Sequence, residues 1–169
     1  MFKSTLAGHP LHPMLIVAPA GLLPFSFVMD LMHLATKEQS YADAAYHSLV
    51  GGFWSGIAAG AAGAVDYMSI PDQSPIKRTG TTHAVLNIAM LSMQAVSLSM
   101  RRGRSRPPAA AVALAGVSTA GLLVSAWFGG HMVYEQGLRV KGRDEIEKVP
   151  DLKLPGDERI AESLERLQL

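Results

Sequence analysis

The sequence predicts an all-α integral membrane protein, a bundle of four membrane-spanning helices followed by an amphipathic C-terminal tail. Four apolar runs of about 18 to 25 residues are long enough to cross the hydrocarbon core of a bilayer. The chain has 15 Lys and Arg and 14 Asp and Glu residues, of which only Asp30 and Asp66 fall inside these runs. A bilayer imposes this segregation because a charge in hydrocarbon is costly, so the first partner implied is lipid.

Composition also excludes several classes of function. The chain has no cysteine, so disulfides, iron–sulfur clusters and thiol catalysis are ruled out. The net charge is only +1, which gives no support for a nucleic-acid partner. The first apolar run follows a stretch of histidine and proline rather than a basic segment, so no cleavable signal peptide is expected.

The first spanning helix is expected over residues 14–35. Directly before it stands the motif GHPLHP at residues 8–13, in which two histidines three apart each precede a proline. A residue before proline is disfavoured in the α conformation, so both histidines are expected to be extended, with His12 near the helix N-cap. Pro19 and Pro24 inside the helix predict a kink rather than a break.

A polar loop at residues 36–46 leads into the second helix, which is expected over residues 47–68. Gly52, Gly56 and Gly60 recur every four residues and form a face of small residues that lets another helix approach closely. We therefore expect the second helix to be central in the bundle.

The third helix is expected over residues 83–100, after a loop at residues 69–82. Its polar side chains His83, Asn87 and Gln94 recur at helical spacing and lie on one stripe. This stripe is expected to face the bundle interior, because lipid offers polar side chains no hydrogen-bond partner.

The fourth helix is expected over residues 109–133, after a loop at residues 101–108 that carries four arginines. Gly121, Ser125 and Gly129 give this helix a second face of small residues. We expect this face, like that of the second helix, to pack closely against a neighbour.

The end of the chain differs in composition from the spans. The sequence divides into a four-span transmembrane domain at residues 1–138 and a charged soluble tail at residues 139–169. Ile160, Leu164 and Leu167 recur at helical spacing and predict a short amphipathic helix in the tail. We interpret this helix as one that rests on the membrane surface or on a partner.

Four spans assign every loop to one of two membrane faces. The N-terminus, the loop 69–82 and the tail share one face, which we call side A. The loops 36–46 and 101–108 share the opposite face, side B. Short loops rich in arginine favour the cytoplasm, so side B is expected to be cytoplasmic and both termini periplasmic.

Sidedness brings four of the six histidines to side A, on three separate segments: His9, His12, His83 and His131. Neutral imidazole is the commonest transition-metal ligand, and the cores of helix bundles are normal places for haem and metal sites. The cluster therefore predicts haem b, or else a transition-metal ion, in a membrane-embedded electron-transfer protein. His83 and His131 would be the axial ligands, with His9 or His12 as a further ligand or a hydrogen-bonding neighbour.

Other residues complete this candidate cofactor site. Lys77 and Arg78 are near enough in sequence to meet haem propionates, and Asn87 and Tyr134 lie close to the two axial histidines. A redox partner protein would approach from side A.

The same residues are compatible with other functions. The histidines can instead cap and bridge helices in a non-redox scaffold or assembly subunit, and a homo-oligomer is compatible with either function. A third hypothesis is a small transporter or proton path through Asp66 and His83. An extended segment advances roughly 9 Å over three residues, so without a bend His9 and His12 are too far apart to chelate one ion. The sequence leaves these alternatives open, including whether the protein is an enzyme.

Four groups of residues together resemble one bacterial membrane family: GHPLHP at residues 8–13, Asp66-Tyr67 with Ile70-Pro71, Arg78-Thr79-Gly80 with His83 and Asn87, and Gly129-Gly130-His131 with Val133-Tyr134. Over about residues 6–142 the chain is similar to the family called domain of unknown function 2231. The resemblance implies a four-helix module of the bacterial inner membrane. Some members are similar to chains with an appended Rieske-type or cytochrome c domain, which implies a redox setting. Some relatives also have a histidine where this chain reads IVAP at residues 16–19.

Overall fold

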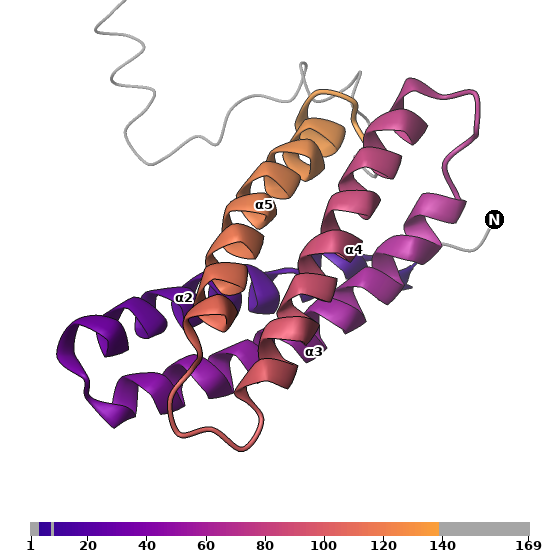
Figure 1. The fold of residues 1–169 in the computed structure, drawn as a ribbon. Helices are drawn as coiled ribbons and strands as arrows, with labels where there is room; N and C mark the ends of the chain where they lie inside the picture. The colour runs from indigo at the N-terminus through magenta and orange to yellow at the C-terminus, as the bar shows by residue number, and fades with distance from the viewer. Residues whose placement is uncertain (1–3, 8, 139–169) are drawn as a thin grey trace, which may run out of the picture. The chain divides into compact units, whose positions relative to one another are not determined.

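A short β-hairpin and five helices follow one another along the chain (Figure 1). The computed structural model describes residues 4–7 and 9–138, and the predicted tail with its amphipathic helix lies outside these residues. The elements are β1 (Thr5–Leu6), β2 (His9–Pro10), α1 (Leu11–Leu15), α2 (Val17–Thr36), α3 (Gln39–Met68), α4 (Pro75–Arg101) and α5 (Ala109–Tyr134). Four spans are long and apolar enough to cross a membrane, the first of which comprises α1 and α2. The predicted all-α bundle of four spans is confirmed.

The long helices pair into two helical hairpins. α2 packs along α3 and α4 packs along α5, while contacts of α3 with α4 and of α2 with α5 join the two hairpins (Figure 1). The small-residue face of α3 serves both kinds of contact, because Gly52 lies against Leu23 of α2 and Gly56 lies against Leu91 of α4. The close packing predicted for this face is therefore found, but α2, α4 and α5 also contact two long helices each, so α3 is no more central than they are.

The first span is interrupted at Ile16, between α1 and α2. Pro19 explains the position of the interruption, since a proline ring clashes with the carbonyl group four residues earlier, here that of Leu15, where α1 ends. Pro24 stands inside α2 without ending it. Ile16 itself stays in the α region, and its carbonyl accepts a hydrogen bond from the N–H of Ala20. The span therefore continues through Ile16 as one helical path, in agreement with the expectation that proline does not break it.

The extended conformation predicted for His12 is wrong. β1 and β2 form an antiparallel hairpin in which Leu6 pairs with His9, so His9 is extended as predicted. The extended segment ends at Pro10, the N-cap of α1, and His12 lies in the first turn of that helix. The Nδ1 atom of His12 lies 2.8 Å from the carbonyl oxygen of Ala59 in α3. This tertiary contact outweighs the local preference of a residue that precedes proline.

Two helices begin earlier than the polarity of the sequence predicts. α3 begins at Gln39, inside the expected loop 36–46, and α4 begins at Pro75, inside the expected loop 69–82. Ser74 caps α4, and proline at the first helical position is favourable because its missing N–H would have no partner there. The polar residues of these segments therefore extend the helices beyond the apolar runs.

The turn between α2 and α3 places a lysine in the left-handed region. Lys37 has a φ of 66°, and its main-chain N–H binds the carbonyl of His33 to cap α2. Non-glycine residues are disfavoured there by about 1–2 kcal/mol, so we expect Lys37→Gly to be more stable than Lys37→Ala by about 1 kcal/mol. Unfolding of both purified variants in detergent checks this order. Equal stability would show that this backbone position is not strained.

Candidate functional site

The polar stripe of α4 faces the bundle interior, as the sequence predicts, and there it meets α5. His83 and Asn87 both contact Ser125 of α5, at the side A end of the helix pair. Further along the stripe, the side-chain amide of Gln94 donates a hydrogen bond to the hydroxyl of Ser118, and each of these two residues is only 1% exposed. The small residues of α5 thus pack against the polar residues of α4.

His83 is held through both of its ring nitrogens. Its Nδ1 lies 2.8 Å from the carbonyl oxygen of Ser125, and because a carbonyl only accepts, Nδ1 carries the hydrogen. The neutral ring then has its lone pair on Nε2, which accepts a hydrogen bond from the side-chain amide of Asn87 at 3.1 Å. Gly129 makes room for the ring, since a Cβ there would lie 3.2 Å from Cε1 of His83.

His12 is held in the same way by α3. Its Nδ1 donates to the carbonyl oxygen of Ala59 at 2.8 Å, so the lone pair of the neutral ring is again on Nε2. Gly63, one helical turn further along α3, lies under the ring, and a Cβ there would be 3.0 Å from Nδ1 and from Cε1. A carbonyl group and a glycine of α3 therefore fix the position of the ring.

The rings of His12 and His83 meet at side A. Their centroids are 6.3 Å apart, and the ring planes are nearly perpendicular, at 84°. Each ring is anchored by Nδ1 on a main-chain carbonyl and has its lone pair on Nε2. Metal-binding histidines are commonly anchored in this way, through the nitrogen that does not touch the metal. We call these two residues the histidine pair, and they form the candidate functional site.

One known protein family matches the part of the chain that contains this site and all five helices. A family model described as "Predicted membrane protein (DUF2231)" matches residues 8–142. The chain belongs to this family. No curated protein and no solved structure matches the chain. The family description agrees with the four spans of the fold and names no activity.

His131, one of the two predicted axial ligands of this DUF2231 protein, has a different neighbour. Its ring stacks on that of Trp127 with centroids 5.5 Å apart and planes 18° apart, and Trp127 is 64% exposed. Ser125, which binds His83, is buried and lies six residues earlier, about 120° away around the helix axis. His131 and Ser125 therefore lie on different faces of α5, and the contacts favour His12 as the neighbour of His83.

His9, the fourth histidine at side A, is exposed in β2. Within residues 4–7 and 9–138, no group of three or more His, Asp or Glu side chains is placed to hold a metal ion. The structure of this part of the DUF2231 protein thus brings His12 and His83 together as a pair, without His9.

The two cations expected to meet haem propionates, Lys77 and Arg78, lie near the side A end of α4 and differ in their surroundings. The ammonium group of Lys77 lies 3.2 Å from the carboxylate of Asp72 and 4.0 Å from the ring centroid of Tyr67. Arg78 is exposed in the first turns of α4, and Tyr134 is 83% exposed at the end of α5. Of these predicted contacts, Arg78 is thus the cation that is most open to a ligand.

Sequence reasoning missed a buried ion pair at the side B end. The carboxylate of Asp30 and the guanidinium of Arg101 form two hydrogen bonds, of 2.7 and 2.5 Å, and their side chains are 0% and 3% exposed. Arg101 belongs to α4, not to the exposed loop 101–108 in which the sequence places it. The signal was present, because Arg101 follows Gln94 at helical spacing and so continues the polar stripe.

Proposed function

We propose that this protein binds a redox-active transition metal at the histidine pair and exchanges electrons with a partner at side A. The observation that carries the proposal is the meeting of two imidazole rings that are each anchored through Nδ1 on a main-chain carbonyl. Both rings are partly buried, so a metal bound there would be shielded from bulk water and still lie close to the membrane face.

The separation of the two rings suits one shared ion. A metal ion lies about 2.0–2.1 Å from an imidazole nitrogen, so two nitrogens on one ion are at most about 4 Å apart. Ring centroids 6.3 Å apart reach that distance only when both Nε2 atoms point toward each other, so binding of one ion requires both rings to turn their Nε2 atoms toward it. For His83 to bind the metal, its Nε2 must lose the hydrogen bond from the side-chain amide of Asn87. That amide can still donate to the hydroxyl oxygen of Ser125, which lies 2.8 Å from its nitrogen.

Electron transfer restricts the choice of metal. Zinc has no redox chemistry, whereas copper and iron change oxidation state and accept imidazole ligands. Copper and iron are therefore the ions of this proposal.

Haem b is the other form of the same proposal. His12 and His83 would hold its iron and Arg78 would meet a propionate, and the group would supply one-electron chemistry. In the structure the two rings are in edge-to-face contact, and they pack closely on the backbone at Gly63 and Gly129. A macrocycle between the rings would need a wide flat slot, so a single ion fits this arrangement better.

A non-redox scaffold is the second candidate function, and the same hydrogen bonds favour it. The bond from His12 to Ala59 joins α1 to α3, and the bond from His83 to Ser125 joins α4 to α5. Such bonds between membrane helices contribute about 0.6–2 kcal/mol each. In this function the histidine pair bridges helices and binds no metal.

Metal analysis of the purified protein separates the two functions. The protein is loaded with copper or ferrous iron, and free metal is removed. We expect the wild type to retain about one ion per chain, and we expect His12→Ala and His83→Ala each to lower the retained metal to background. His47→Ala is the matched control, since His47 is an exposed histidine of α3 outside the pair. An absorption spectrum of the protein as purified reports haem by its Soret band.

Each other outcome has a definite meaning. A wild-type protein that is colourless and retains no metal contradicts both metal forms and supports the scaffold. Loss of metal in His131→Ala but not in His12→Ala would show that the ligands are those predicted from the sequence, and would overturn the pairing proposed here.

A further inference from the structure

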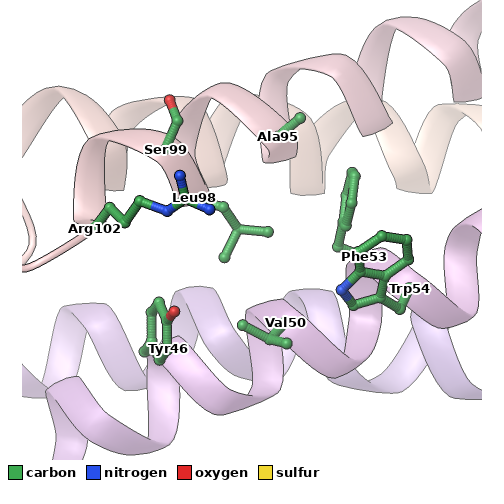
Figure 2. Close-up of a pocket in the computed structure, with 8 residues that line it drawn as sticks. All are labelled: Tyr46, Val50, Phe53, Trp54, Ala95, Leu98, Ser99 and Arg102. Atoms are coloured by element: carbon green, nitrogen blue, oxygen red, sulfur yellow. The ribbon is translucent and has the colours of Figure 1, made fainter.

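A groove opens between the two helical hairpins near side B. It encloses about 350 Å³ between α3 and α4, and its walls are largely apolar (Figure 2). Val50 and Phe53 line it from α3, and Ala95 and Leu98 line it from α4. The volume is at the lower end of the range for ligand pockets, which suits one hydrocarbon chain better than a whole lipid.

The two ends of the groove differ in chemistry. Figure 2 shows Arg102 and Tyr46 at one end, and Phe53 and Trp54 at the other. Trp54 is 64% exposed on a helix that is able to cross a membrane, so its end of the groove lies on the surface that lipid covers. The guanidinium and the phenol mark the end nearer to side B.

Arg102 carries a charge that the described part of the protein does not neutralise. Arg101 beside it is paired with Asp30, but no carboxylate among the described residues lies within ion-pair distance of Arg102. Arg104 and Arg106 follow in the same loop and are exposed. The groove therefore ends in an uncompensated cation, with more positive charge following it along the chain.

We propose that this groove binds one anionic phospholipid from the leaflet at side B. An acyl chain lies along Val50, Phe53 and Leu98, and the phosphate receives hydrogen bonds from the guanidinium of Arg102 and the hydroxyl of Tyr46. Arginine suits phosphate because its planar guanidinium donates two parallel hydrogen bonds. The proposal does not depend on metal binding at side A.

Lipid binding to the detergent-purified full chain tests the proposal. Native mass spectrometry compares retention of dioleoylphosphatidylglycerol with that of dioleoylphosphatidylcholine. We expect wild type to prefer the anionic lipid, and Arg102→Gln to lower its affinity about fivefold, the effect of one arginine at an anionic lipid surface. Arg104→Gln is the matched control, because it removes the same charge from the same loop outside the groove.

A second variant tests the apolar part of the groove. Ala95→Phe fills it, and is expected to weaken binding of both lipids, while an unchanged melting temperature in lipid-free detergent shows that the variant folds. Equal losses of affinity for the anionic lipid in Arg102→Gln and Arg104→Gln would show that general charge attraction accounts for the preference, and would overturn the proposed site. Dimers in wild type that Ala95→Phe dissociates would instead assign the groove to a second copy of the chain.

Discussion

Replacing Arg101 by methionine is expected to lower the free energy of unfolding by about 3–5 kcal/mol, because it leaves a buried carboxylate without its partner. Asp30 is 0% exposed, and both of its carboxylate oxygens accept hydrogen bonds from the guanidinium of Arg101. Removing one member of such a pair costs more than removing both, since the remaining charge stays in a low-dielectric interior. Chemical unfolding of the purified variants in detergent measures the loss.

Two further variants make this expectation specific to the pair. Arg102→Met changes the neighbouring, exposed arginine in the same way, and is expected to alter stability by no more than about 0.5 kcal/mol. The double variant Asp30→Leu/Arg101→Met replaces the pair by apolar side chains and is expected to be more stable than Arg101→Met alone. Similar losses in Arg101→Met and Arg102→Met would show that the pair contributes nothing beyond surface charge.

The location of this ion pair gives it a role in the assembly of the bundle. Asp30 lies on α2 and Arg101 on α4, so the pair joins one helical hairpin to the other at side B. At side A the histidine pair has the corresponding position: His12 binds α3 of the first hairpin, and His83 binds α5 of the second. The groove lies between α3 and α4 toward side B. The hydrogen bonds of His12 and His83 each stay within one hairpin. The hydroxyl of Tyr67 on α3 lies 2.8 Å from that of Thr81 on α4, so polar contacts join the hairpins near both membrane faces.

The spans and their order were predictable from hydropathy, but the helix ends were not. Apolar runs report where lipid surrounds a helix, and a helix can continue into water. For this reason α3 begins at Gln39 and α4 at Pro75, inside segments whose polarity favoured loops. Ser74 followed by Pro75 is a start signal for a helix that can be read from sequence.

The sequence predicts how far along each helix the candidate site lies, but not which faces of the helices meet there. Counting the spans and loops places His83 and His131 at the same membrane face. This fixes their positions along the helix axes, but not the directions in which their side chains point. Which face of α5 meets α4 depends on packing, and Ser125 with Gly129 occupies that face. The polar stripe of α4 was predicted because its residues share one helix, whereas a ligand pair on two helices also requires their relative rotation.

The glycines of α3 offer a test of how closely the helices of one hairpin pack. Gly52→Ala is expected to lower the free energy of unfolding by about 1–3 kcal/mol, the usual cost of an extra methyl group in a filled core. A Cβ at Gly52 would lie 2.6 Å from Cδ2 and 2.8 Å from Cγ of Leu23. Leu23 is only 4% exposed, so its side chain has little room to move away. Chemical unfolding in detergent again measures the change.

Gly60 is the matched control, because it belongs to the same row of small residues on the same helix. Nothing lies within 4 Å of a Cβ at Gly60, so Gly60→Ala meets no neighbour. Alanine favours the helix over glycine by up to about 1 kcal/mol, so this variant is expected to be as stable as the wild type or more stable. The two substitutions change the same atoms, and only packing distinguishes them. Equal effects at both positions would mean that α2 and α3 do not meet at Gly52, and that the hairpin packs differently from the structure described above.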